Sequence, residues 1–416
     1  MSGAPSAQAP SQVLEGGARK RVLGATCGAH AVHDGIADAL YVLLPIWASS
    51  FGLSYAAAGS LKSAYSIALA ALQMPAGMLA ERLGERLLLG VGTVAAGAAF
   101  ALAAWAPGYA ALFALILATG VASAVQHPIG SSLIAKAYDG GGRRSALGVY
   151  NFAGDVGKMA AAVLIGAGAA WYGWRAITLG YGIAVAAVGI AVLIVLGPAR
   201  RSALAGPRSV APPDPKDAAG GRQPGFGFTD ARGYAILSAI QVVDSAGRVG
   251  VLTLVPFLLV AKGASTATAG LALTLLFAGG AAGKLACGLL AERLGLLATV
   301  MLTEVMTAVL IVAVILSPLP LALACLPVLG IALNGTSSVL YGTVSEFVRA
   351  DRQARAFGLF YSLGSAAGAT APVLFGLVSD RAGLATALYA VATVVLATLP
   401  LALALRPHLA RASRGM

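Results

Sequence analysis

Charged side chains are scarce in this sequence of 416 residues. Asp, Glu, Lys and Arg make up 11% of it, whereas 58% of the residues are hydrophobic. A soluble domain carries about 25% charged residues, so the composition excludes an ordinary soluble protein. The formal net charge of +12 would suggest nucleic acid as a partner of a soluble protein. Here the placement of the basic residues explains it better, and we expect a lipid bilayer and no nucleic acid as partners.

Cysteine is rare as well. The three cysteines fall in apolar stretches and provide neither a disulfide framework nor a paired Cys/His metal motif. The sequence also lacks a Gly-rich phosphate loop and a Gly-x-Ser-x-Gly elbow. No soluble stretch is long enough to fold into a catalytic core. We therefore expect no enzymatic activity and no cofactor.

Glycine, in contrast, is abundant, with 53 residues, and much of it recurs at a fixed spacing. The stretch 77–84 (GMLAERLG) has a second copy at 288–295 (GLLAERLG), 211 residues later. The same spacing places Gly52, Ser54 and Gly59 on Gly263, Ser265 and Gly270. Small residues allow membrane helices to pack closely. The repeat predicts a protein made of two related halves.

Twelve apolar runs are long enough to cross a bilayer, which takes about 20 residues each. We expect an all-α membrane protein with two six-helix bundles, at 22–197 and 233–405. Residues 1–21 are expected to form a disordered N-terminus. The Pro-rich stretch 198–232 is expected to be a linker between the bundles, and 406–416 a short tail.

The basic residues are distributed unevenly between the loops. With the N-terminus inside, 21 of the 28 Lys and Arg fall in cytoplasmic segments and three in outer loops. Positive charge is enriched on the cytoplasmic side of membrane proteins. This bias predicts that both termini and the linker face the cytoplasm.

This organisation resembles the major facilitator superfamily, whose motif in the loop after the second helix is Gly-x-x-x-Asp-Arg-x-Gly. Here Glu takes the place of Asp in both copies, and a looser third copy at 376–383 follows the eleventh helix. The resemblance implies alternating-access transport, with the motif acting as a conformational latch. An alternative is that the motif only ends helices and sets topology. The latch residues would be Gly77, Glu81, Arg82, Gly84, Gly288, Glu292, Arg293 and Gly295.

A narrower resemblance is to the fosmidomycin-resistance branch of drug exporters. It is carried by HAVHD at 30–34, LP at 44–45, FGLS at 51–54, QMPAG at 73–77 and HP at 127–128. It implies an exporter in the bacterial inner membrane. The helix 5 sequence GDVGK at 154–158 departs from the small or neutral residues of that branch, which leaves the drug specificity open.

Ionisable residues inside membrane helices mark functional sites, because each costs about 2.5–3.5 kcal/mol at the bilayer centre. His30, Asp34 and Asp38 share one face of the first helix, since they are four residues apart. We expect protons to be carried by Asp34, Asp155, His33, Asp244 and Asp38. We expect substrate to be bound by Lys158, Arg248, His127, Asn151, His30, Tyr150 and Gln126.

Other interpretations of these residues remain open. Asp155 with Lys158, and Asp244 with Arg248, are spaced to form simple intrahelical ion pairs. The set His30, His33, Asp34 and Asp38 could instead bind a metal ion or form a polar seam, although we expect no metal. Lys62 and Lys284 are expected to snorkel toward the interfaces, and Glu304 to be solvated near a helix end.

The interpretation that we favour is proton-coupled transport of a small organic anion or anionic drug, as export, by a monomer. Carboxylates in a low-dielectric cavity can exchange protons near neutral pH, and Arg and Lys recognise carboxylate or phosphonate groups. The alternatives are a symporter that takes up a carboxylate nutrient and a multidrug antiporter for cationic or neutral compounds. A membrane sensor that binds without transport would not need a latch.

Overall fold

The protein is built of α-helices throughout the part of the chain that the computed structural model describes, residues 16–138, 142–197, 227–349 and 352–412. Within these ranges, twelve helical spans are long and apolar enough to cross a membrane. The predicted N-terminus 1–21, linker 198–232 and tail 406–416 lie partly outside the described residues. Their described parts are helical or border a helix, since the first helix begins at Gly16, α9 begins at Ala231 and the last helix runs to Ala412.

The first bundle contains the spans of the N-terminal half, two of which are interrupted. Its helices are α1 (Gly16–Phe51), α2 (Tyr55–Leu83), α3 (Glu85–Leu102) continued by the 3-10 turn η1 (Ala103–Trp105), α4 (Tyr109–Ser123) followed by α5 (Gln126–Ala137), α6 (Arg143–Tyr172) and α7 (Trp174–Leu196).

The second bundle repeats this order. Its helices are α9 (Ala231–Ala261), α10 (Thr266–Leu294), α11 (Leu296–Leu316), α12 (Leu319–Thr343) with the 3-10 turn η2 (Val344–Phe347), α13 (Gln353–Ala382), and α14 (Leu384–Leu396) followed by α15 (Thr398–Ala412). Ser54 and Ser265, one repeat apart, both cap a helix by accepting the N–H of the third residue onward, at 3.2 and 3.1 Å. The repeat in the sequence is therefore a repeat in the structure.

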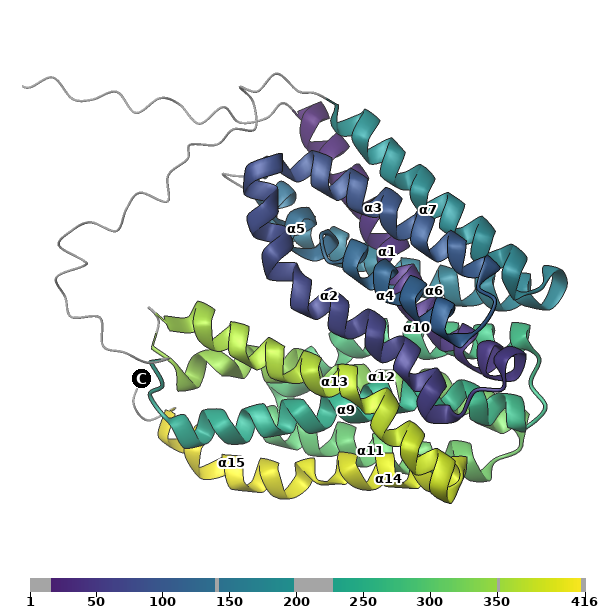
Figure 1. Ribbon diagram of the computed structural model, residues 1–416. Helices are drawn as coiled ribbons and strands as arrows, with labels where there is room; N and C mark the ends of the chain where they lie inside the picture. The colour runs from purple at the N-terminus through teal and green to yellow at the C-terminus, as the bar shows by residue number, and fades with distance from the viewer. Residues whose placement is uncertain (1–15, 139–141, 198–226, 350–351, 413–416) are drawn as a thin grey trace, which may run out of the picture.

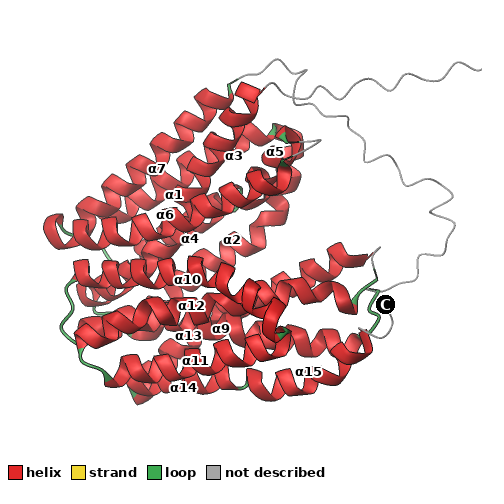
Figure 2. Cartoon of the chain, turned by 180° about the vertical axis from the view of Figure 1, so that it is seen from behind, coloured by secondary structure: helices red, strands yellow, loops and turns green. Residues whose placement is uncertain are grey.

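The two bundles pack on each other along α2 with α13 and along α6 with α10. Figure 1 and Figure 2 show that they converge where α1 ends and α2 begins, and diverge toward the ends where α1 begins and α15 ends. We call the convergent side the outer side and the divergent side the inner side, after the predicted topology.

Close backbone contacts hold the outer side together. A Cβ on Gly59 of α2 would lie 2.3 Å from the carbonyl oxygen of Pro372 in α13, and one on Gly376 would lie 2.6 Å from the Cα of Ala56. Only glycine permits such an approach of two helices. The aromatic rings of Tyr55 and Phe257 also meet across the bundles, with centroids 5.1 Å apart.

One carboxylate completes this outer contact. Asp380, near the end of α13, accepts the backbone N–H groups of Tyr55 at 2.7 Å and of Ala56 at 3.0 Å. These are among the first N–H groups of α2, which have no partner within the helix, and the helix N-terminus carries partial positive charge. The third copy of the loop motif thus contacts the opposite bundle on the outer side.

Another carboxylate anchors the start of α9 on the inner side. Asp230 accepts the N–H of Gly233 at 2.9 Å and contacts Nδ1 of His408 in α15. The Gly233 N–H and the His408 contact lower the pKa of Asp230. Asp230 therefore stabilises the folded state at pH values above the ordinary aspartate pKa. This stabilisation is lost as the pH falls through the lowered pKa of Asp230. His408, in the predicted tail 406–416, thus has a structural partner.

Candidate functional site

Two cavities meet near the middle of the first helix. The first, of about 640 Å³, is lined by α1, α2 and α5 from one bundle and by α9, α12 and α13 from the other. The second, of about 600 Å³, lies among α1, α5, α6 and α10. Asp34 and His127 line both cavities. Each cavity receives residues from both halves, so a bound solute would contact both bundles.

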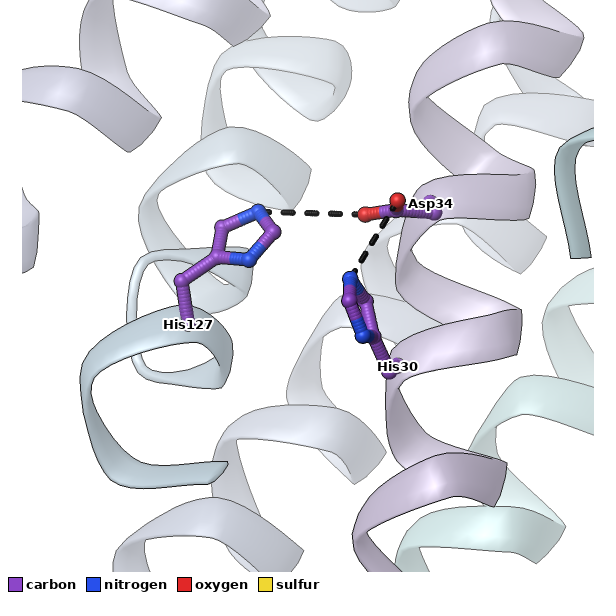
Figure 3. A group of neighbouring side chains, drawn as sticks. All are labelled: His30, Asp34 and His127. Atoms are coloured by element: carbon purple, nitrogen blue, oxygen red, sulfur yellow. Dashed lines mark ion pairs between the residues drawn. The ribbon is translucent and has the colours of Figure 1, made fainter. Parts of the chain in front are cut away.

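Asp34 is the centre of the polar contacts between these cavities. Its Oδ2 lies 3.3 Å from Nε2 of His30, one turn earlier on α1, and its Oδ1 lies 3.8 Å from Nε2 of His127 on α5. Figure 3 shows the two imidazoles approaching the carboxylate from different helices. The side chains of His30 and Asp34 are almost fully buried, whereas that of His127 is 42% exposed. His127 therefore connects the buried carboxylate to the cavities.

The hydrogen bonds of His30 require an additional proton at this contact. Its Nδ1 lies 2.9 Å from the carbonyl oxygen of Tyr150, which can only accept, so Nδ1 must carry a hydrogen. Its Nε2 faces Asp34 Oδ2, which also accepts when it is ionised. The contact is attractive only if a second proton sits on Nε2 or on Oδ2. The geometry therefore contains a place for one exchangeable proton between His30 and Asp34.

Lys158 lies among three carboxylates. Its Nζ is 3.2 Å from Asp34, 3.5 Å from Asp155 and 4.0 Å from Asp38. The intrahelical pair of Asp155 with Lys158 is formed, but it is one contact of a larger set that joins α1 to α6. Because its charge is already balanced, Lys158 can bind an anion only when one of these carboxylates loses its charge.

Lys284 extends the network into the other bundle. The prediction that this α10 side chain snorkels is wrong, because its Nζ lies 2.7 Å from Oδ2 and 2.8 Å from Oδ1 of Asp155. This ion pair connects α6 with α10. A chain of ionic contacts thus runs from His127 through Asp34, Lys158 and Asp155 to the C-terminal half.

Arg248 has a different environment. The ion pair with Asp244, which their spacing allowed, is not formed; the guanidinium instead contacts Ser245 Oγ at 3.4 Å and lines the first cavity. Its Nε is buried and has no hydrogen-bond partner within the described ranges. A guanidinium that faces a cavity without a carboxylate partner is suited to bind an anion.

Lys62 is buried inside the protein, which differs from the prediction that it snorkels. It was expected to snorkel toward the outer interface, but it is 5% exposed. Its Nζ donates to the carbonyl oxygen of Ala37 at 2.7 Å and lies 4.4 Å from the ring centroid of Tyr41. This ammonium therefore contributes positive charge to the wall of the first cavity.

The other predicted site residues divide between the cavities and the helix packing. Asp38 and Gln126 line the first cavity, and Asn151 lines the second. Tyr150 is 2% exposed; its hydroxyl accepts from Gln126 Nε2 at 2.9 Å, and its ring centroid lies 4.1 Å from that of His30. Tyr150 lines neither cavity, so its contacts position His30 and Gln126. His33 borders the first cavity, but its Nε2 bonds to Thr93 Oγ1 on α3 at 3.0 Å.

Three side chains could hold a metal ion in geometric terms. Ligand atoms of His30, Asp34 and His127 all lie within 4.8 Å of one another. The metal alternative from the sequence used His33, which instead points to Thr93. The Lys158 ammonium lies 3.2 Å from Asp34 Oδ2. A dication would have to displace this ammonium or tolerate its charge, so the donor set fits a proton better than a metal.

The two inner copies of the loop motif form no ion pair and no side-chain hydrogen bond between the bundles within the described residues. Glu81, Arg82, Glu292 and Arg293 are all exposed, and in the described parts of the chain none of them forms an ion pair or a side-chain hydrogen bond. Gly84 and Gly295 end their helices with φ of 96° and 83°, which favours glycine. The neighbouring Glu85 pairs with Lys136 at 2.9 Å inside its own bundle.

Sequence reasoning missed one buried acid. Glu304 was expected to be solvated near a helix end, which is wrong, because it lies eight residues into α11 and is 2% exposed. It is close to the carboxyl group of Asp244. The spacing of 211 residues, which maps His33 on Asp244, also maps Thr93 on Glu304, and this was the signal that could have identified the pair.

Comparison with solved structures shows the same fold. The chain superposes on a bacterial homolog of the human lysosomal transporter Spinster, in an inward-facing and unoccupied conformation, with a TM-score of 0.73 and 18% identity over 96% of this chain and 98% of that chain. The nucleoside transporter NupG gives a TM-score of 0.75 and 14% identity, covering 93% of this chain and 99% of that one.

A third similar structure is a peptide transporter, POT, in complex with sulfate, with a TM-score of 0.75 and 14% identity over 94% of this chain and 95% of that chain. No match was found among curated proteins. The fosmidomycin-resistance branch is not confirmed and stays a prediction. The family model of the Major Facilitator Superfamily matches residues 26–235 and 237–415. With twelve membrane-length helices in two repeated bundles around a shared cavity, this chain belongs to the Major Facilitator Superfamily.

Proposed function

We propose that this chain is a proton-coupled secondary transporter that moves a small organic anion by alternating access. The observation that carries the proposal is the environment of Asp34. The Asp34 carboxylate contacts both the imidazole of His30, a contact that requires a proton, and the ammonium of Lys158. Proton binding and anion binding would therefore compete for the charge of the same side chain.

The coupling follows from that sharing. When Asp34 takes up a proton from His30 or from water in the cavity, its attraction for Lys158 falls. The ammonium can then bind an anionic group in the second cavity, since Asp155 is also paired with Lys284. A bound anion in turn compensates Lys158 and favours the protonated form of Asp34. The proton and the anion thus stabilise each other's binding.

Arg248 supplies the second recognition group. It faces the first cavity and forms no ion pair with a carboxylate of the described residues, and the two cavities meet at Asp34 and His127. A carboxylate or phosphonate can bind the guanidinium through paired N–H donors. Lys62 adds positive charge on the same wall. When Asp34 is protonated, Arg248 and Lys62 outnumber Asp38, the remaining carboxylate that lines the first cavity, which supports an anionic substrate over a cationic drug.

Joint binding of proton and anion favours symport over antiport. In an antiporter, the proton and the substrate would bind alternately. Here the loss of charge on Asp34 is what releases Lys158, so the two ligands bind in the same state. In a membrane with an inward proton gradient such a symporter would take up its anion. This geometry supports the uptake alternative of the sequence analysis more than export.

Alternating access is supported by the two sides of the molecule. The bundles are in contact on the outer side through Asp380 and the glycine contacts, whereas both inner copies of the loop motif are exposed. We propose that Glu81, Arg82, Glu292 and Arg293 engage the opposite bundle when the inner side closes. With the termini in the cytoplasm of a bacterial cell, the present state would be inward-facing, and a monomer would suffice.

The proposal is tested in proteoliposomes that contain a pH-sensitive dye. Carboxylates, phosphonates and cationic drugs are added outside in turn, and proton entry is recorded for wild type and for protein-free vesicles. We expect protons to enter only with certain anions. Proton exit on addition of cationic drugs, with no response to any anion, would identify an antiporter for cations and refute the proposal.

Asp380→Ala is expected to open the outer side. Loss of a carboxylate that caps a helix costs about 1 kcal/mol, which shifts a two-state equilibrium about fivefold. Pulsed EPR distances between labels at Ser50 and Ala261, both exposed at the outer ends of α1 and α9, should gain a longer population in a cysteine-free background. Arg381→Ala, at the adjacent exposed position, is the matched control. Equal distance distributions for both variants would show that Asp380 does not hold this side closed.

A further inference from the structure

Two buried acids lie close together in the C-terminal half, outside the two cavities. Asp244 on α9 is 4% exposed and Glu304 on α11 is 2% exposed. Their carboxyl groups lie within reach of a shared proton. Oδ2 of Asp244 and Oε1 of Glu304 are buried and have no hydrogen-bond partner in the described part of the chain. Neither residue lines the cavities described above.

The internal repeat gives this pair a counterpart. Adding 211 to His33 gives Asp244, and adding 211 to Thr93 gives Glu304. In the first half, His33 Nε2 contacts Thr93 Oγ1 at 3.0 Å, and the Thr93 hydroxyl donates to the carbonyl oxygen of Leu89 at 2.7 Å. His33 is therefore the donor, and the contact is satisfied by neutral groups. In each bundle, a buried polar pair at this position joins the first and third spans: His33 with Thr93 in one, and Asp244 with Glu304 in the other.

Two acids at this location cannot both be ionised. Buried like charges in contact repel strongly, and each ionised carboxyl also loses its hydration. Arg248, four residues along α9, contacts Ser245 and forms no ion pair with Asp244, and no other base among the described residues pairs with either acid. One proton shared between the carboxyls removes one charge and provides the missing donor.

We propose that Asp244 and Glu304 form a second proton-binding site, which holds one proton in the present conformation. The pair joins α9, which lines the first cavity, to α11, which does not line it. A movement of α9 against α11 would separate the carboxyls and release the proton. The role in coupling rests on the proposed function, whereas the protonated state of the pair does not.

Few ionisable groups act on this pair. Arg248 on α9 is the neighbouring cation. The hydroxyl of Tyr341 on α12 interacts electrostatically with Asp244. The described residues of α10, α13, α14 and α15 bring no further charge that acts on either carboxyl. A pH dependence that disappears with either acid can therefore be assigned to the pair.

Infrared spectroscopy of the purified full-length protein tests the proposal without any substrate. Wild type should show the C=O band of a protonated carboxyl group that shifts in D₂O and disappears at alkaline pH. Glu304→Gln and Asp244→Asn should each remove this band or shift its frequency, and Glu346→Gln, at an exposed position of η2, should do neither. Two variants are used so that misfolding of one does not prevent the test.

Thermal unfolding provides a second readout. Wild type should lose stability as alkaline pH removes the shared proton, whereas Glu304→Gln, which keeps a neutral hydrogen-bonding group, should not. A band that both substitutions leave unchanged would overturn the proposal. Loss of the wild-type band on adding sodium chloride at constant pH would also overturn it, because the pair would then bind a cation. Failure of transport with a normal band would instead refute only the proposed function.

Discussion

Asp34→Asn is expected to abolish anion-driven proton entry into proteoliposomes. The amide keeps the shape of the carboxyl group but cannot take up a proton or balance Lys158. Three contacts are affected, to His30, His127 and Lys158, at 3.3, 3.8 and 3.2 Å. Removing one partner of a buried ion pair costs about 3–5 kcal/mol, so the melting temperature should also fall by several degrees.

The matched control is Asp38→Asn, one turn further along the same face of α1. Its carboxylate reaches Lys158 only at 4.0 Å, so transport should be reduced rather than lost. Anion binding to Asp34→Asn, measured by calorimetry, should no longer depend on pH around neutrality. Proton entry at the wild-type rate in Asp34→Asn would show that the proton is carried elsewhere. The pair of Asp244 and Glu304 would then be the first alternative.

Arg248→Ala is expected to weaken anion binding about 10- to 100-fold, because a hydrogen bond to a charged group contributes about 1.5–3 kcal/mol. The guanidinium faces the first cavity and its Nε has no partner there. Little stability should be lost, since the Ser245 contact is long, at 3.4 Å. The measurement is the Kd of the anion identified in the proteoliposome assay.

Two further variants make this result specific. Arg248→Lys keeps the charge but not the fork of donors, so it should recover part of the affinity. Arg232→Ala removes an exposed charge from the start of the same helix and should leave the Kd unchanged. If Arg248→Ala and Arg232→Ala bind the anion equally well, Arg248 serves packing and the substrate does not contact it.

Much of the fold could be predicted from the sequence. Apolar run length determined the twelve spans, and the repeated GMLAERLG and GLLAERLG stretches determined the two halves. These signals are local or depend on simple spacing. The cluster of His30, Asp34 and Asp38 was also predictable, because residues four apart on one helix must share a face.

The partners of these charges were less predictable. Whether Lys284 snorkels or reaches Asp155 depends on how α10 is rotated against α6, and glycine contacts such as Gly166 with Gly270 set that approach. Lys62 is buried rather than at the interface, because its ammonium contacts the Ala37 carbonyl and the ring of Tyr41. Pairs between helices depend on side-chain direction, which hydropathy does not report.

Glu304 illustrates a signal that was present but unused. Its place in an apolar run near a predicted end of a span suggested a solvated residue. The 211-residue spacing links it to Thr93, and the structure shows that both positions face the first helix of their bundle. Comparing the two halves residue by residue would have identified a buried acid pair before any coordinates.

If proton and anion bind together at Asp34, protons must be taken up from solution during anion binding, and they can be counted. Anion binding to the purified protein is measured by calorimetry in several buffers that differ in their heat of ionisation, for wild type and for Asp34→Asn. We expect uptake of about one proton per anion by wild type and of none by the variant. Anion binding to wild type without proton uptake would contradict this expectation.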